Sequence, residues 1–328
     1  MIYNIEDYSS CLFRIPKNGK RVLWEITNSC NYACSYCIFS SGPGKINGEL
    51  STDDAYRVLE ELKEEGFTHI KFTGGEPFIR KDLIEILRRG AQLDFTCDIS
   101  TNASAINERN ARKLSQINLS MVHVSLDGHT REIQEKIRGE NTYGRTINGI
   151  QNIKIFTSHY LRIGTVLYKE NEGHIEDMIK FYESLGAEEV VFSRMEPIGR
   201  MQGNLKLNAI KTDDELEKEI LELTAKYSER IKVNSSFNRR NQDGCRGSCP
   251  GGDKFLFIDN LGRVSPCTWV VEKDPNFRSV ITLKENSLSQ ILNSSPLKKY
   301  SRVIKIIEER KILGCPARKL EKVLLDLN

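Results

Sequence analysis

Residues 21–200 alternate short apolar segments with amphipathic ones, and this alternation limits the folds open to the chain. The amphipathic segment 51–66, STDDAYRVLEELKEEG, has helical spacing, a capping-box pattern at Ser51 and Asp54, and a glycine at its end. Six apolar segments joined by helical crossovers require a parallel sheet covered by helices. The sequence therefore predicts an α/β fold, with a partial (β/α)6 TIM-like barrel as first choice and an open doubly wound sheet as second.

The pattern changes after the sixth apolar segment. The polar stretch that follows contains one charged amphipathic helix, and farther on KFLFI and RVSPC flank a turn-rich tetrapeptide that predicts a β-hairpin. We therefore expect four parts: an N-terminal segment at 1–20, the partial barrel at 21–200, a connector helix at 201–244, and a small domain of a β-hairpin plus a helix at 245–328.

Composition excludes several classes of function. Lys and Arg number 48 against 45 Asp and Glu, a balance that does not favour a nucleic-acid partner. No apolar run approaches the roughly 20 residues that cross a bilayer, and residues 1–20 lack the apolar core of a signal peptide. We therefore expect a cytoplasmic protein without a membrane partner. In that reducing compartment, its nine cysteines indicate metal or redox chemistry over disulfides.

Three of the cysteines, Cys30, Cys34 and Cys37, lie within the short segment CNYACSYC. Structural zinc normally takes four protein ligands, so a zinc site here needs a fourth ligand from elsewhere in the chain. A [4Fe–4S] cluster takes one thiolate per iron, and three thiolates leave one iron open to bind something else. The spacing alone leaves a cluster, a zinc site and buried apolar cysteines as alternatives.

Polar motifs stand directly after four of the predicted strands. CNYACSYC follows RVLWEITNS, TGGEP follows HIKF, STN ends DFTCDI, and SLDG ends MVHV. In a βα barrel the chemistry lies on loops at the C-terminal ends of the strands. All four motifs are therefore expected at one mouth of the barrel.

Together these motifs resemble the radical S-adenosylmethionine (SAM) enzymes, over about residues 21–200. The resemblance implies that Cys30, Cys34 and Cys37 hold a [4Fe–4S] cluster whose open iron chelates the amino and carboxylate groups of SAM. It also implies reductive cleavage of SAM to a 5′-deoxyadenosyl radical, which abstracts hydrogen from an unactivated C–H bond. An electron donor such as flavodoxin or ferredoxin would then be a partner.

The same resemblance implies a set of SAM-binding residues. Tyr36 matches the aromatic position near the adenine. The loop expected to receive the methionyl ammonium consists of Gly74, Gly75, Glu76 and Pro77. In it, glycine lets the backbone approach a ligand closely, and a carboxylate suits a cation.

Further residues are implied at the ends of the third and fourth strands and just beyond them. The ribose or carboxylate of SAM is expected to contact short polar side chains, those of Ser100, Asn102 and Ser125. Its methionyl carboxylate is expected to pair with Arg138. For Ser100, Ser125 and Arg138, a helix cap or a surface ion pair is the alternative interpretation.

The C-terminal cysteines resemble a second cluster site. The spacing of Cys249, Gly262 and Cys267 matches the opening of SPASM and twitch domains, which hold auxiliary [4Fe–4S] clusters behind a radical SAM barrel. Cys315 is expected as a later ligand. The chain lacks the complete series of SPASM cysteines after Cys267, so we expect one auxiliary cluster in a twitch-like domain.

Cys245 has three interpretations. It is the fourth ligand of the auxiliary cluster, a free thiol that faces the substrate, or a structural residue. A free thiol in that position returns a hydrogen atom to a substrate radical, and this step turns hydrogen abstraction into epimerisation.

The remaining candidates carry weaker signals. Cys97 alternates with apolar neighbours in a strand and is interpreted as buried filler, whereas Cys11 has no assigned role. Arg194, Glu196 and Arg200 end the sixth strand, so they either face the substrate or form ordinary salt bridges. The five histidines show no metal-ligand spacing and are interpreted as structural; they are His69, His123, His129, His159 and His174.

Three functions remain open. The first is dehydrogenation or epimerisation of a small polar metabolite, such as a sugar or aminocyclitol, and the second is epimerisation or cross-linking of a ribosomal peptide. An auxiliary cluster suits both, because it can accept an electron or bind substrate. A module of roughly 80 residues for peptide recognition does not precede the first strand, which favours the metabolite. The third is a zinc-bound structural or binding protein.

Overall fold

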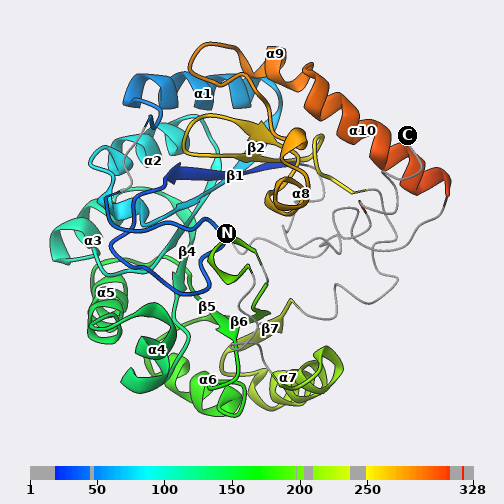
Figure 1. Cartoon of the computed structure of the whole chain (residues 1–328). Coiled ribbons are helices and arrows are strands. Elements are labelled where there is room, and N and C mark those ends of the chain that lie inside the picture. The colour runs from blue at the N-terminus through cyan, green and yellow to red at the C-terminus, as the bar shows by residue number, and fades with distance from the viewer. Residues whose placement is uncertain are drawn as a thin grey trace.

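A computed structural model describes residues 19–44, 48–196, 198–202, 210–236, 249–310 and 320. Cys11, Cys245 and Cys315 therefore lie outside the described residues. The described chain forms one curved sheet with helices around its outer face (Figure 1).

The sheet has nine strands in the order β7-β6-β5-β4-β3-β2-β1-β8-β9. Their bounds are β1 Lys20–Thr27, β2 Phe67–Gly74, β3 Thr96–Thr101, β4 Leu119–Ser125, β5 Leu161–Leu167, β6 Glu189–Arg194, β7 Lys232–Ser235, β8 Phe255–Ile258 and β9 Val264–Ser265. Every neighbouring pair is parallel except β8 and β9. In the described residues β7 and β9 are free edges, so the sheet does not close. Strands β1 to β7 lie side by side in chain order and their connecting helices cover only the outer face, so the partial barrel is confirmed over the doubly wound alternative.

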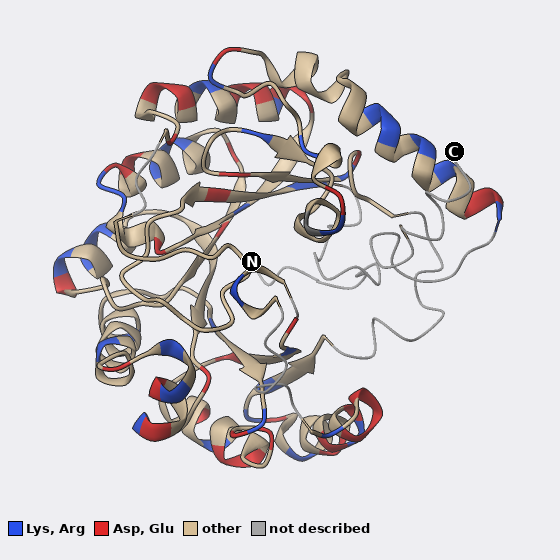
Figure 2. Cartoon of the chain, viewed as in Figure 1, with Lys and Arg blue, Asp and Glu red and all other residues tan. Residues whose placement is uncertain are grey.

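The helices that connect the parallel strands lie outside the sheet (Figure 1). Their bounds are α1 Thr52–Glu64, α2 Leu83–Gln92, α3 Glu108–Leu114, α4 Arg131–Arg138, α5 Tyr143–Phe156, α6 Ile175–Ser184 and α7 Asp213–Tyr227. The C-terminal part adds α8 Thr268–Lys273, α9 Leu288–Leu292 and α10 Ser295–Glu309. Short 3-10 turns are η1 Pro77–Ile79, η2 Gly199–Met201 and η5 Pro275–Phe277. Figure 2 shows charges of both signs interspersed along the outer helices.

Strand β1 shows how the sequence separates the outer core from the barrel interior. Val22, Trp24 and Ile26 are buried in the large apolar cluster that joins the sheet to the helices. Leu23 and Glu25 alternate with them, and each borders a cavity inside the barrel. One face of the strand therefore stabilises the fold, and the other is available for chemistry.

Local signals predicted the first helix and the hairpin. The Ser51 side chain caps α1 by accepting a hydrogen bond from the backbone N–H of Asp54, and the Asp54 side chain completes the capping box. Strands β8 and β9 pair antiparallel around the turn at 259–262, as the tetrapeptide predicts.

The sheet contains two parallel strands beyond the six that the sequence predicted. Strand β7 follows α7 in the connector and pairs parallel with β6, and β8 of the hairpin pairs parallel with β1. KVNS has one apolar residue in four, so its sequence carries no strand signal. The partner of β8 is more than 200 residues away, and local patterning does not encode such a pairing.

None of the described helices is both long enough and apolar enough to cross a membrane.

Candidate functional site

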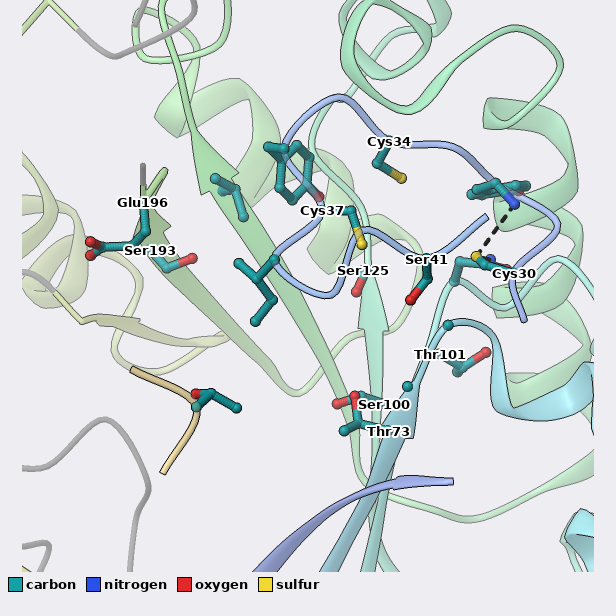
Figure 3. A pocket seen from close by; sticks show the side chains of 18 of the residues that line it. Cys30, Cys34, Cys37, Ser41, Thr73, Ser100, Thr101, Ser125, Ser193 and Glu196 are labelled. Carbon is teal, nitrogen blue, oxygen red and sulfur yellow. Dashed lines mark hydrogen bonds between the residues drawn. The ribbon is translucent and has the colours of Figure 1, made fainter. Parts of the chain in front are cut away.

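A cavity of about 420 Å³ lies at the C-terminal ends of the barrel strands. It brings together most of the residues predicted for SAM and cluster binding: Cys30, Cys34, Tyr36, Cys37, Gly74, Gly75, Ser100, Asn102, Ser125 and Arg138 all line it. In Figure 3 the three cysteines lie along one loop, beside the strand ends that carry Ser100 and Ser125. The expectation that the strand-end motifs meet at one mouth is met for these residues.

The cysteine loop is held by backbone hydrogen bonds at its start and inside it. The N–H of Cys30 donates to the carbonyl of Gly42 at 3.2 Å, and the N–H of Ser35 donates to the carbonyl of Ile137 at 2.9 Å. The guanidinium of Arg200 donates to the carbonyls of Cys34 and Ser41. Arg200 therefore holds the cysteine loop in place. The sequence had suggested that it either faces the substrate or forms a salt bridge.

The three thiols form a donor set suited to iron. All three are free, and burial raises the pKa of Cys30 to about 12, with the nearby Glu76, Cys34 and Cys37 adding to the shift. Thiols gathered in this way can bind iron as thiolates, since the charge of the metal offsets theirs. Among the described residues that line the cavity there is no fourth cysteine and no histidine. The residues fit a cluster with one iron left to an outside ligand.

The glycine pair of GGEP brings the end of β2 against the segment before Cys30. The N–H of Gly75 donates to the carbonyl of Thr27, and the N–H of Glu76 donates to the carbonyl of Ser29, both at 2.8 Å. A Cβ on Gly74 or Gly75 would overlap the carbonyl oxygen of Thr27 or Ser29, and Gly74 has φ of +144°. Only glycine permits this approach of the two backbones.

The Glu76 carboxylate is engaged within the protein and does not line the cavity. It is fully buried and accepts hydrogen bonds from Thr101 Oγ1 at 2.7 Å, the N–H of Asn102 at 2.7 Å and the N–H of Phe78 at 3.0 Å. Burial raises its pKa to about 7, against the lowering effect of these hydrogen bonds. Glu76 thus positions Asn102, whose side-chain amide contacts Cys30 Sγ at 3.8 Å. Pro77 also lies outside the cavity lining.

A buried ion pair stands behind the cavity wall. Arg138 Nε donates to Asp127 Oδ2 at 2.7 Å, and the same oxygen accepts from the Tyr36 hydroxyl at 2.6 Å. Asp127 Oδ1 accepts from the N–H of Val166 at 2.9 Å. The surface ion pair suggested for Arg138 is therefore a buried one, because Asp127 is fully enclosed. Sequence reasoning missed Asp127, although its place in SLDG at a strand end was the available signal.

The hairpin brings the two described C-terminal cysteines into one apolar cluster. Cys267 lies within that cluster and Cys249 packs against it. Cys267 caps α8, with its sulfur accepting from the N–H of Val270 at 3.4 Å, and Cys249 Sγ lies 3.4 Å from the hydroxyl of Tyr300. The proposed partners Cys245 and Cys315 lie outside the described residues.

Arg194 and Glu196 line the cavity, which agrees with the interpretation that they face the substrate. Arg194 also forms an ion pair with Asp213 and donates to the carbonyl of Lys211 at 2.9 Å, so the salt-bridge interpretation holds for it as well. Figure 3 places Ser193 and Glu196 on the opposite side of the cavity from Cys30. Thr268 and Trp269, from α8, complete the lining.

A second cavity of about 320 Å³ adjoins the first, and Ile38 and Thr268 line both. Its wall includes Glu25 from β1 and Asp259, Arg263 and Arg278 from the C-terminal part. Burial raises the pKa of Glu25 to about 7, although Asn28 Nδ2 donates to its carboxylate at 3.0 Å. Sequence reasoning did not single out Glu25, which looks like one polar position in an apolar strand.

Two family models match the chain. Residues 24–182 match the radical SAM superfamily, and residues 249–316 match an iron-sulfur cluster-binding domain known as SPASM. The AdoMet-dependent heme synthase of Oleidesulfovibrio alaskensis is 27% identical over 76% of this chain and 69% of its own length. The mycofactocin maturase MftC of Mycobacterium ulcerans is 26% identical over 84% of this chain and 74% of its own length.

Solved structures share the fold. SuiB of Streptococcus suis bound to its precursor peptide SuiA superposes with a TM-score of 0.71 at 16% identity, covering 88% of this chain and 67% of SuiB. The enzyme anSMEcpe, solved with AdoMet and the Cp18Cys peptide, has a TM-score of 0.65 at 18% identity, covering 86% and 82% of the two chains. At these identities the likeness supports the fold alone.

Proposed function

The chain belongs to the radical SAM superfamily and carries a SPASM-type domain, and from this premise we propose that it modifies a carbon centre of a peptide. Its two domains indicate a [4Fe–4S] cluster in the barrel, an auxiliary cluster in the C-terminal domain, and SAM as cofactor. When bound, the barrel cluster and SAM would together supply the radical chemistry that removes hydrogen from a C–H bond of the substrate. The zinc-scaffold alternative does not survive the family match.

The barrel cluster is proposed to be held by Cys30, Cys34 and Cys37. Their shared cavity and the absence of a fourth cysteine or histidine among its described lining residues support this assignment. SAM is proposed to lie in the same cavity against Gly74 and Gly75, because both glycines line it.

The polar residues that line the same cavity are proposed to bind SAM. We assign the methionyl carboxylate to Arg138, which borders the cavity and is oriented by Asp127. Asn102, Ser100 and Ser125 supply polar groups along the strand ends, and Tyr36 supplies an aromatic ring. Glu76 acts as a positioning residue, because its carboxylate is already engaged by protein donors.

The names of the relatives favour a peptide over the small metabolite that the sequence suggested. One relative is a mycofactocin maturase, and two structures of the same fold were solved with peptides bound. In this chain the cavity wall is built from both domains, because Ser193 and Glu196 of the barrel lie opposite Cys30 and Trp269 of the C-terminal domain also lines the cavity. This two-domain wall is the observation that carries the proposal, because it offers polar and aromatic contacts to a chain entering between the domains.

Cys245 is proposed to be the fourth ligand of the auxiliary cluster, together with Cys249, Cys267 and Cys315. The hydrogen-donor interpretation makes a different prediction for Cys245→Ala. A donor variant keeps its iron and still cleaves SAM but loses the product, whereas a ligand variant loses about four iron per chain.

The experiment uses anaerobically reconstituted enzyme with dithionite, SAM and peptides encoded by neighbouring genes, in deuterated water. Mass spectrometry of the peptide is the readout. A gain of solvent deuterium with unchanged formula means epimerisation, a loss of two mass units means oxidation, and an internal cross-link also counts as modification. Unchanged peptides, with conversion of a sugar, an aminocyclitol or a porphyrin under the same conditions, would overturn the peptide assignment.

A further inference from the structure

We propose that His129, His174 and Asp177 form a binding site for a divalent transition-metal ion on the outer rim of the barrel. One ligand atom from each residue lies within 4.8 Å of the others. None of the three lines either of the two cavities described above. The site is therefore distinct from both proposed clusters.

Two loops at the same end of the barrel supply the three ligands. His129 follows SLDG at the end of β4, His174 immediately precedes α6, and Asp177 lies in the first turn of α6. The carbonyl of His129 accepts from the Tyr143 hydroxyl at 3.0 Å, and the N–H of His174 donates to the carbonyl of Asn171 at 2.9 Å. Both loops are therefore fixed before any ion binds.

The candidate ligand atoms have few hydrogen-bond partners within the described protein. His129 Nδ1 is buried and has no hydrogen-bond partner among the described residues. His174 Nδ1 is 3.4 Å from Asp177 Oδ2, and within the described part of the chain this is the only ion pair of Asp177. The imidazole rings lie 5.1 Å apart between centroids. A buried nitrogen without a partner is costly, and a metal ion would satisfy it.

The chemistry of the ligands selects the class of metal. Two imidazoles and one carboxylate suit Zn²⁺, Ni²⁺, Co²⁺ or Fe²⁺, whereas Mg²⁺ and Ca²⁺ prefer oxygen ligands throughout. His174 and Asp177 are exposed, so water completes the coordination shell.

The site lies next to the residues that support the SAM cavity. The side-chain amide of Asn171 donates to the carbonyl of Asp127 at 2.8 Å, and Asp127 orients Arg138 and Tyr36. His129 is two residues from Asp127, and His174 is three residues from Asn171. A bound ion would cross-link the two loops that hold Asp127 and stabilise that wall of the cavity.

The test titrates Ni²⁺ into the anaerobic holoenzyme, with heat release as the binding signal and absorbance near 400 nm as a check that both clusters stay intact. We expect one saturable ion per chain and a higher melting temperature when it is bound. His174→Ala and Asp177→Asn should each weaken binding at least about tenfold. The side chains of His174 and Asp177 are 45% and 54% exposed, so these variants are expected to fold.

Asp214→Asn is the matched control, because Asp214 is an exposed aspartate in the first turn of α7. It should bind Ni²⁺ as the unaltered protein does. The proposal is overturned if His174→Ala and Asp177→Asn bind Ni²⁺ with unchanged affinity, since the ion would then occupy other groups, or if the holoenzyme binds none.

Discussion

Asp127 connects several parts of the candidate site, although sequence reasoning did not single it out. Its two carboxylate oxygens accept from Arg138, Tyr36 and the backbone of Val166, and its own N–H donates to Gln134 Oε1 at 2.7 Å. Removing one partner from a buried charged pair leaves the other charge uncompensated. The orientation of Arg138 and Tyr36 therefore depends on this one side chain.

Asp127→Asn should weaken SAM binding without removing the cluster. An amide neutralises the partner of Arg138 and loses a charge-assisted hydrogen bond, so we expect the KM for SAM to rise about tenfold or more. Iron content and the 400 nm absorbance should stay near those of the unaltered protein. Tyr36→Phe, which removes one hydroxyl from the same network, should give a smaller rise. A KM unchanged in Asp127→Asn would contradict the positioning role.

Glu25 makes the stability of the protein depend on pH. Its folded pKa of about 7 exceeds its ordinary value of 4.5, so between those values the folded state holds a proton that the unfolded state has released. Stability is therefore greatest at low pH in this window and falls as pH rises towards 7, by about 1 kcal/mol per pH unit for this carboxyl.

The measurement is the melting temperature of the anaerobic holoenzyme between pH 5 and 7, within the window in which Glu25 contributes. Glu25→Gln should flatten the decline seen in the unaltered protein, while the buried Glu76, with a pKa also near 7, preserves part of it. Glu222→Gln, at an exposed position on α7, should leave the decline as it was. An unchanged slope in Glu25→Gln would show that Glu25 does not hold the proton.

At the residue scale, the sequence predicted those site residues whose role follows from their chemical type alone. Three closely spaced thiols and a glycine pair at strand ends have few other uses, and both border the cavity. The direction in which Glu76 points was not predictable, because its partners Thr101 and Asn102 come from the next strand. The pairing of His129 with His174 was hidden for the same reason, since they are 45 residues apart in the chain.

At the scale of elements, the junction of β2 with the cysteine loop depends on the absence of a side chain at Gly75. Gly75→Ala would push the end of β2 away from Ser29 and displace the loop that carries Cys30. We expect a loss of about 1–3 kcal/mol in stability, as for overpacked cores, together with lower iron retention during gel filtration.

Gly173→Ala is the control for this variant, because Gly173 is exposed and a Cβ there meets no atom within 4 Å. It should retain iron and melt near the unaltered temperature. Equal iron retention in Gly75→Ala and Gly173→Ala would contradict the close approach of the two backbones.

The sequence identified elements with strong periodicity or caps and missed those defined by distant pairing. Helix α1 has a capping box and an apolar face of Val58, Leu59 and Leu62, and it forms as predicted. Strand β7 is four residues long with one buried residue, so its place beside β6 depends on the sheet and not on its own pattern. Tertiary context decides such short strands.

At the scale of the whole molecule, the C-terminal domain is joined to the barrel through the sheet itself. Strand β8 pairs with β1 from Arg21 with Phe255 to Trp24 with Ile258, and α8 supplies part of the wall of the SAM cavity. Cys249 and Cys267, the proposed ligands of the auxiliary cluster, flank this hairpin. We therefore propose that the barrel and the C-terminal domain hold separate metal centres on one sheet.

Separate centres predict separable losses of iron. The reconstituted protein should contain about eight iron per chain, and Cys249→Ala with Cys267→Ala should reduce this to about four. The remaining barrel cluster should still cleave SAM, while modification of the peptide is lost. A fall to no iron in the double variant would mean that the two centres do not form independently.

The release of 5′-deoxyadenosine from SAM and dithionite, measured by chromatography under anaerobic conditions, tests the central claim most directly. The claim is that three barrel cysteines hold a cluster with one iron open to SAM. The unaltered protein and the Cys249→Ala, Cys267→Ala double variant should both release 5′-deoxyadenosine, and Cys34→Ala should release none. Release by Cys34→Ala at the unaltered rate, or no release by the fully reconstituted protein, would contradict the account.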